Sequence, residues 1–150
     1  MSDPDPKTVK YLLAELREVN KDKRRTAVIK LGMVGGDEAV RALIMLVQNK
    51  HEDLIVRGRA ALMLGKLGDS RAVTALIEAL DAPGFQTPLY AAQSLGKLGD
   101  PRAIPPLVRL LDTDHEKFRE AARESLQRLG YFVEGARGEG DGEPQVEVET

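Results

Sequence analysis

The sequence predicts an all-α protein, a right-handed α-solenoid of four helix–turn–helix repeats with about eight helices. A five-residue motif that begins with leucine and ends with glycine recurs at residues 31–35, 64–68, 95–99 and 126–130. The leading leucines are 33, 31 and 31 residues apart, and an alanine stands four residues before each of them. A small residue one helical turn from a large one is what close packing between helices requires.

A second, independent pattern predicts the first helix of each unit. Apolar residues recur there at positions i, i+3, i+4 and i+7, which places them on one face of an α-helix. The four sets are Val9, Leu12, Leu13 and Leu16; Val40, Leu43, Ile44 and Val47; Val73, Leu76, Ile77 and Leu80; and Ile104, Leu107, Val108 and Leu111. We therefore expect first helices near 6–19, 37–48, 70–81 and 101–111. We expect Pro105 and Pro106 to bend the last of these, because two backbone donors are missing.

The leucine–glycine motif predicts the second helices, near 22–34, 54–67, 88–98 and 116–129. Each ends at a glycine, the residue that adopts a left-handed C-cap at the least cost. The positions that hold Val28-Ile29, Ala61-Leu62 and Ala92-Gln93 in the other second helices hold Arg123 and Glu124 in the last unit. We interpret this polar pair as a cap on the stack, so that four units form the complete array.

The charges divide the chain into two parts. Residues 131–150 hold six acids and one base, a net charge of -5, which leaves +3 for residues 1–130 because the whole chain carries -2. We expect a repeat domain over 1–130 and an acidic tail rich in Gly and Glu over 131–150. Such a tail cannot bury enough apolar surface to offset its ordering entropy, so we expect it to be disordered. Tyr131, Phe132 and Val133 are expected to pack on the end of the folded body.

The composition excludes several classes of function. The chain has no Cys, which removes disulfides, thiolate metal sites, cysteine nucleophiles and covalent thioether attachment. A body charge of +3 and an aromatic content of 4% disfavour nucleic acid as a partner. The polar, acidic start and the lack of an apolar run of membrane length predict no signal peptide and no membrane span. We therefore expect a cytoplasmic protein.

The segments 64–73 and 95–104 share the pattern Leu-Gly-Lys-Leu-Gly-Asp-x-Arg-Ala-Val/Ile, which resembles the short HEAT-like repeat of the phycobilisome lyase type. The resemblance covers about residues 5–130 and implies the paired-helix solenoid. Repeats of this kind occur in bilin lyase subunits, hydroxylases, chaperone-like factors and plain scaffolds, so the resemblance leaves the function open.

The same family has an Asp in the turn between paired helices and an Arg that opens the second helix. Asp53 and Arg57 match both features. Arg24 and Arg119 match the Arg, while Asn20 and His115 replace the Asp. We expect these three arginines to brace adjacent units through turn carboxylates. The third unit, with Gly84 and Pro88 at these positions, departs from both features, so we expect the bracing to be interrupted there.

A metal site is the first enzymatic candidate, because the only histidines, His51 and His115, each precede a glutamate. The resemblance includes the deoxyhypusine hydroxylases, whose di-iron site uses His-Glu pairs on the second helices. The equivalent positions here hold Arg25-Thr26, Gly58-Arg59, Leu89-Tyr90 and Glu120-Ala121. We interpret both histidine pairs as solvated turns, with metal binding as the alternative, and expect no metal ligands and no catalytic residues.

The remaining candidate is a surface, because second helices commonly line the concave side of such solenoids. The residues expected to bind a partner there are Arg25, Arg59, Lys66, Tyr90, Gln93, Lys97 and Arg128. Three of these are basic residues that recur at one level of the repeat, which favours another protein or an acidic peptide, the protein's own tail included. The alternative is an ordinary solvated helix surface.

We therefore predict a non-enzymatic, monomeric interaction scaffold that needs no cofactor and binds a partner on its concave face. The alternative from the resemblance is an accessory subunit or relative of a phycobilin lyase. Enzymatic activity, if present, would then be of the bilin lyase type. Without Cys, such a protein holds a bilin only non-covalently or delivers it to a partner's thiol. A metal-dependent hydroxylase-like protein is the third reading, disfavoured because the His-Glu pairs are out of register.

Overall fold

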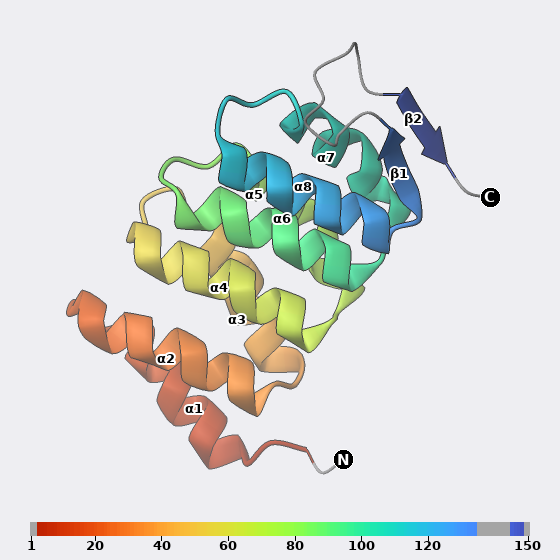
Figure 1. The fold of residues 1–150 in the computed structure, drawn as a ribbon. Coiled ribbons are helices and arrows are strands. Elements are labelled where there is room, and N and C mark those ends of the chain that lie inside the picture. The colour runs from red at the N-terminus through yellow and green to blue at the C-terminus, as the bar shows by residue number, and fades with distance from the viewer. Residues whose placement is uncertain (1–2, 135–144, 149–150) are drawn as a thin grey trace.

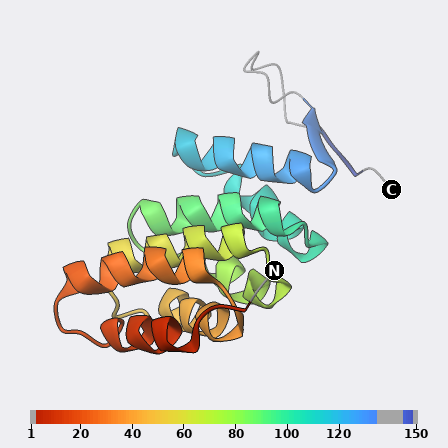
Figure 2. The same ribbon diagram turned by 90° about the horizontal axis from the view of Figure 1, so that it is seen from below.

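The protein is built from two layers of helices that follow one another in repeat order. The computed structural model describes residues 3–134 and 145–148. The helices are α1 (Pro6–Glu15), α2 (Lys21–Val34), α3 (Asp37–Gln48), α4 (Leu54–Leu67), α5 (Val73–Ala79), α6 (Gln86–Leu98), α7 (Ile104–Leu110) and α8 (Glu116–Arg128). The second helices α2, α4, α6 and α8 lie side by side in one layer, and the first helices form the other (Figures 1 and 2). The all-α repeat fold is confirmed.

The first helix is shorter than predicted. α1 ends at Glu15 rather than at residue 19, and the chain leaves it through turns in which Arg17 N donates to Ala14 O and Glu18 N donates to Glu15 O. The apolar stripe stops at Leu16, so a longer helix would bury nothing more. Val19, which follows, is 95% exposed.

The first helices of the third and fourth units begin differently from the prediction. Each opens with a 3₁₀ turn, η1 (Ser70–Ala72) or η2 (Pro101–Ala103), before the α-helix starts. Pro105 and Pro106 therefore fall in the first turn of α7, where backbone N–H groups have no partner within the helix. The predicted proline bend within a helix over 101–111 is wrong, because the third unit has the same break without prolines.

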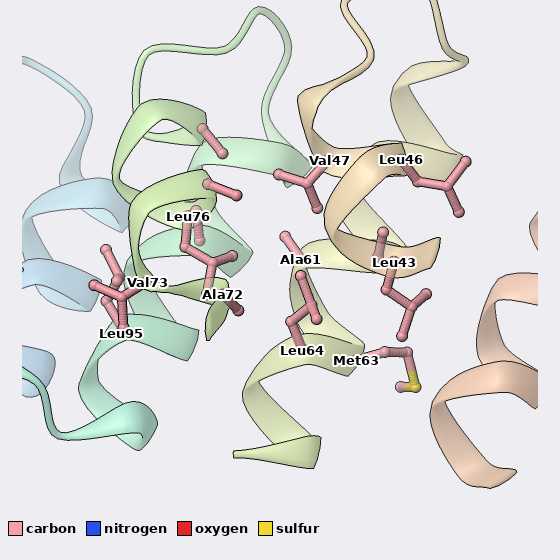
Figure 3. Packing of buried hydrophobic residues seen from close by; sticks show 14 of the residues in the cluster. Leu43, Leu46, Val47, Ala61, Met63, Leu64, Ala72, Val73, Leu76 and Leu95 are labelled. Carbon is pink, nitrogen blue, oxygen red and sulfur yellow. The ribbon is translucent and has the colours of Figure 1, made fainter. Parts of the chain in front are cut away.

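The core lies between the two layers. It is formed largely by residues of both sequence patterns, the one on the first helices and the one on the second helices. The repeat leucines Leu31, Leu64, Leu95 and Leu126 are fully buried, and the alanines one turn before them are 0–2% exposed. Leu43 and Leu76 of the first helices face these residues across the layers (Figure 3). The periodicity in the sequence therefore identifies the core correctly.

The second helices approach one another closely at the glycine that follows each repeat leucine. A Cβ atom built on Gly65 would lie 2.9 Å from Ser94 Cα, and one on Gly96 would lie 2.8 Å from Ser125 Cα, closer than real Cβ atoms come to other atoms. Each serine hydroxyl also donates to the neighbouring second helix: Ser94 Oγ to Ala61 O at 2.7 Å and Ser125 Oγ to Ala92 O at 2.6 Å. Glycine is therefore required in one helix so that serine fits in the next.

The same repeat positions show where the stacking contact stops. Gly32 faces Met63, so the contact exists between α2 and α4 without the hydroxyl bond. In α8 the glycine position holds Gln127, which is exposed. No helix of the described residues follows α8 in the layer, and the glycine is absent where it is not needed.

The C-terminal segment continues as two short strands. β1 (Tyr131–Glu134) pairs with β2 (Gln145–Val148) in antiparallel register, with Tyr131 opposite Val148 and Glu134 opposite Gln145. Tyr131 packs against the core cluster beside α8, as expected, but Phe132 is 41% exposed, so the expectation that it also packs on the body is wrong. The expected disorder of 131–150 falls on residues 135–144 and 149–150, which lie outside the described residues, while the described segments are paired strands.

Among the residues that the structure describes, no helix has both the length and the apolar content needed to cross a membrane.

We predict that Gly65→Ala lowers the free energy of unfolding by about 1–3 kcal/mol, because the added methyl group collides with Ser94. This loss exceeds the gain of about 1 kcal/mol in helix propensity from the same change. Urea unfolding followed by circular dichroism measures it. The control is Gln127→Ala, at the same repeat position with nothing stacked on it, which should change stability by less than about 0.5 kcal/mol. Equal losses in both variants would contradict the stacking contact.

Candidate partner-binding face

The outer face of α2, α4, α6 and α8 carries one row of residues at a single repeat level, two positions after each repeat leucine. The row consists of Met33, Lys66, Lys97 and Arg128, and all four are exposed. Lys66, Lys97 and Arg128 lie in the last turn of their helices, where a cation interacts favourably with the unpaired carbonyl groups. The helices thus present three cations and one apolar side chain along one edge of the layer.

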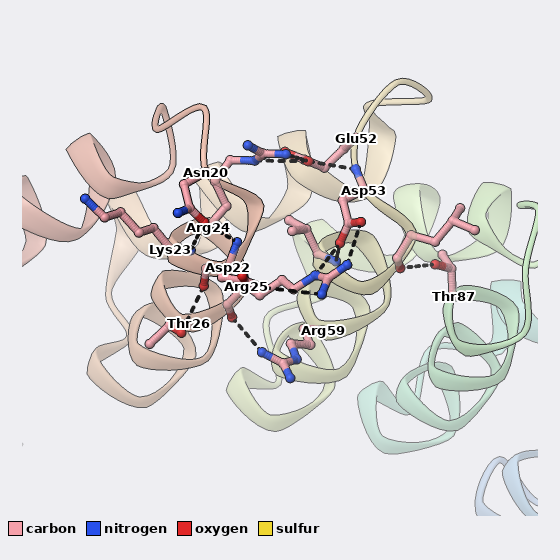
Figure 4. Close-up of polar contacts among 12 residues, drawn as sticks. Asn20, Asp22, Lys23, Arg24, Arg25, Thr26, Glu52, Asp53, Arg59 and Thr87 are labelled. Carbon is pink, nitrogen blue, oxygen red and sulfur yellow. Dashed lines mark hydrogen bonds and ion pairs between the residues drawn. The ribbon is translucent and has the colours of Figure 1, made fainter.

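Arg25 lies at the other end of the second helices and is already paired. Its guanidinium donates to Asp53, from Nε to Oδ2 at 2.8 Å and from Nη2 to Oδ1 at 2.9 Å (Figure 4). Asp53 is the N-cap of α4 and also accepts from Val56 N. The hydrogen-bonded Arg25 therefore holds the pKa of Asp53 well below its usual value, at about 2.

Arg59 is also engaged between these two helices. Its Nη1 donates to Arg25 O at 3.1 Å, so both arginines connect α2 to α4 (Figure 4). This junction lacks the serine hydroxyl that connects the later helices, and the polar contacts take its place. Arg25 and Arg59 have a structural role that their positions in the sequence did not reveal.

Tyr90 and Gln93 lie on α6 and are half-buried. Tyr90 packs against the core cluster. Gln93 lines a groove of about 340 Å³ between α6 and α8, opposite Glu120 and Glu124 of α8. The groove also contains Lys117, so its charge is mixed. The seven predicted residues therefore divide into an exposed basic row of three, a paired junction of two, Gln93 in a polar groove and Tyr90 against the core.

The three arginines that open second helices do not all act as expected. Arg24 does brace adjacent units, because its Nη2 donates to Glu52 at 2.9 Å. Arg57 donates instead to Val47 O at the end of α3, and Arg119 donates to Thr113 O in its own unit. The expected interruption at the third unit is present, since the N-cap of α6 is Phe85, which makes no side-chain capping hydrogen bond.

The histidines occupy turns. His51 is exposed, and His115 is the N-cap of α8, where its Nδ1 accepts from Lys117 N at 3.2 Å. Within residues 3–134 and 145–148, no three or more His, Asp or Glu side chains are grouped so that they could hold a metal ion.

An aromatic cluster at the turn end joins the third and fourth units. The rings of Phe85, His115 and Phe118 lie with their centroids 4.6–5.5 Å apart, and the Phe118 ring stacks on the other two. The sequence predicts His115 only as a solvated turn residue and does not predict this cluster. The available signal was that Phe85 and His115 directly precede neighbouring second helices, where they are the N-caps.

Comparison with known proteins places these features in a wider context. The family model for HEAT repeats matches residues 9–87 and 89–127. A chain in the complex of CpcE and CpcF of phycocyanin lyase from Nostoc sp. PCC7120 is 33% identical, with a TM-score of 0.73 over 81% of this chain and 53% of that one. No curated protein sequence matches significantly.

Two further solved structures share the fold. Human deoxyhypusine hydroxylase, in complex with glycerol, is 23% identical, with a TM-score of 0.69 over 85% of this chain and 46% of that one. An engineered protein is 20% identical, with a TM-score of 0.59 over 87% of this chain and 63% of that one. The present chain spans about half the length of the lyase and hydroxylase chains.

We predict that Asp53→Asn lowers the free energy of unfolding by about 1 kcal/mol at pH 7, because Asn keeps the N-cap acceptor but removes the charge that pairs with Arg25. The pKa of Asp53 is about 2 in the folded protein and about 3.9 in the unfolded chain. The carboxylate therefore stabilises fully above about pH 4, and this stabilisation is lost as the pH falls through 2.

Urea unfolding of both proteins between pH 7 and pH 2 measures this difference. The control is Asp22→Asn, whose carboxylate is 81% exposed and 3.5 Å from Arg25, and its effect should be small at every pH. A difference for Asp53→Asn that persists unchanged at pH 2 would contradict the role of the ion pair.

Proposed function

The chain belongs to the HEAT repeat family, and from this premise we propose that it is a non-enzymatic scaffold that binds another protein across the face of its second helices. The observation that carries this proposal is the row of Lys66, Lys97 and Arg128, exposed at the same level of three neighbouring helices. Among the described residues, none of the three makes a salt bridge. The row is therefore available to acidic groups of a partner.

The chemistry of the row defines the partner that suits it. Successive cations on parallel helices match an extended or helical segment that carries several carboxylates. Met33 extends the row on α2 and is 76% exposed, so an apolar side chain near one end of that segment would have a contact. We propose an acidic polypeptide, bound by a monomer of this protein in the cytoplasm without a cofactor.

A photo-crosslinking amino acid placed at Lys97 tests the face directly. We expect it to capture the partner from an extract of the source organism. The same amino acid at Lys10, which is exposed on α1 in the other layer, should not capture it. Lys66→Glu together with Lys97→Glu should abolish capture of that same protein by an affinity-tagged scaffold. Capture from Lys10 alone, or undiminished capture by the doubly reversed variant, would reject this face.

A second candidate function is supported by one comparison. The chain is 33% identical to part of a protein in the CpcE–CpcF complex of phycocyanin lyase, and that assembly contains two different proteins. We propose as the alternative that this chain is an accessory subunit or relative of a phycobilin lyase, with a second protein as its partner.

Absorbance spectroscopy with phycocyanobilin separates the two proposals. An accessory lyase subunit that holds the bilin should shift or sharpen its visible band on mixing. Serum albumin, which binds many hydrophobic pigments, serves as a control for non-specific binding. An unchanged spectrum, both alone and with candidate apoprotein present, would count against the lyase alternative and leave the scaffold.

A further inference from the structure

The groove between α6 and α8 is a feature to which the basic row gives no role. It has a volume of about 340 Å³ and lies within the layer of second helices (Figure 1). Phe85, the N-cap of α6, lines it together with Leu89 and with Ala121 of α8. Phe85 is 43% exposed, although its ring is apolar. Exposed aromatic side chains of this kind are enriched where one protein contacts another.

The ring of Phe85 is held in place from the α8 side. The Phe118 ring stacks on it with a centroid distance of 5.5 Å and an interplanar angle of 18°, and the centroid of the His115 ring lies 5.0 Å from it. A side chain that is already fixed loses little conformational entropy when a ligand binds to it. The exposed part of the ring is therefore a preformed contact for a partner.

Two carboxylates border the same groove. Glu120 and Glu124 of α8 are exposed and stand four residues apart, so they project from one face of the helix. Neither makes a salt bridge among the described residues. Gln93 lines the groove from α6, and Lys117 contributes a single cation. The lining therefore carries a net charge of -1, since two acids stand against one base.

The two glutamates depart from the repeat. The equivalent positions, six and two residues before each repeat leucine, hold Arg25 and Ile29 in α2, Gly58 and Leu62 in α4, and Leu89 and Gln93 in α6. A polar cap on the stack explains why α8 has polar residues here, but it does not require both of them to be acids. Their common sign, beside an exposed aromatic ring, favours a ligand that is positively charged and partly apolar.

Among the cations that a polypeptide carries, an arginine side chain suits this groove best. Its planar guanidinium stacks on an aromatic ring and donates to two carboxylates at once. A lysine ammonium is more strongly hydrated and has no plane that could stack. The aliphatic stem of an arginine covers apolar surface, such as that of Leu89 and Ala121.

We propose that the groove between α6 and α8 binds an arginine side chain of a partner polypeptide, with Glu120 and Glu124 as its acceptors and Phe85 as the ring on which it stacks. The inference rests on the proposed function, because it concerns the same partner on the same layer of helices. It adds a cationic residue to the acidic segment that the basic row accepts.

The groove and the basic row together give the bound segment a direction. Lys97 lies four residues after Gln93, and Arg128 lies four residues after Glu124, which is one helical turn further along each helix. A segment that meets both features therefore has its arginine nearer the N-termini of α6 and α8. Its acids lie nearer the C-termini of these helices.

The probe is N-acetyl-arginine amide, which carries a single guanidinium, titrated into the ¹⁵N-labelled protein at pH 7. We expect saturable shifts of the backbone amide signals of Leu89, Gln93, Glu120 and Ala121. N-acetyl-citrulline amide has nearly the same shape without the charge, and it should bind about fivefold more weakly. Equal binding of these two compounds, or no saturable shift, would overturn the proposal. N-acetyl-lysine amide should also bind more weakly, and equal binding would refute the assignment to arginine.

Charge-neutral variants test the two acceptors. Glu120→Gln and Glu124→Gln should each weaken binding of the probe about threefold, because each removes one carboxylate from the groove. The matched control is Glu116→Gln, an exposed glutamate of the same helix that does not line the groove, and it should leave the affinity unchanged. Equal weakening in all three variants would show a general attraction to α8 and contradict the site, as would no weakening in any of them.

Two variants of Phe85 test the stacking ring. Phe85→Leu keeps an apolar side chain without the ring and should weaken binding of the probe about threefold. Phe85→Tyr keeps the ring and should bind the probe as the original protein does. Circular dichroism checks that both variants are folded. Undiminished binding by Phe85→Leu would refute the stacking role.

These experiments separate the groove from the basic row. The probe has no acidic group, so its binding does not need Lys66 or Lys97. Capture of the partner from position 97 without any binding of the probe would overturn the arginine site alone. Loss of that capture with binding of the probe intact would reject the basic row and support the groove as a site in its own right.

Discussion

The close approach of neighbouring second helices is the constraint on which the rest of the structure depends. It requires a residue without a side chain directly after each internal repeat leucine, since Met63, Ser94 or Ser125 of the next helix occupies that space. Only at this separation do the serine hydroxyls reach the carbonyl groups of Ala61 and Ala92. The exposed row of cations follows from the same geometry, because equal stacking brings equivalent positions of three helices into line.

The junctions between units are held together in different ways. α4, α6 and α8 are joined by glycine–serine contacts, and the aromatic rings of Phe85, His115 and Phe118 add to the last junction. The junction between α2 and α4 relies on charged groups, with Arg24 paired to Glu52 and Arg25 to Asp53. The first unit is therefore the more sensitive to acid and salt, because the ion pair that joins the second and third units, Arg71 with Asp37, is more exposed.

The sequence predicts the helical layers because the buried residues recur at the spacing of an α-helix, and this spacing can be seen in a single sequence. Leu64 and Ala60 are recognisable as core residues without any neighbour being known. The sequence does not predict η1 and η2, since the choice between 3₁₀ and α geometry at a helix start depends on a few weak hydrogen bonds. Nor does it predict the partners of Arg25 and Arg57, which lie about 30 and 10 residues away. Only the packed structure shows that one guanidinium meets Asp53 and that the other donates to Val47 O.

The serine and glycine of one helix also bear on how such a protein changes its length. The third unit carries both halves of the contact: Ser94 points back to the preceding helix and Gly96 admits the following one. A gene duplication that copied this unit in place would bring its own serine against its own glycine, and both new junctions would fit at once. The fourth unit, with Gln127, lacks the second half. Internal repeats can therefore multiply in evolution by a single event, whereas the terminal one must first mutate.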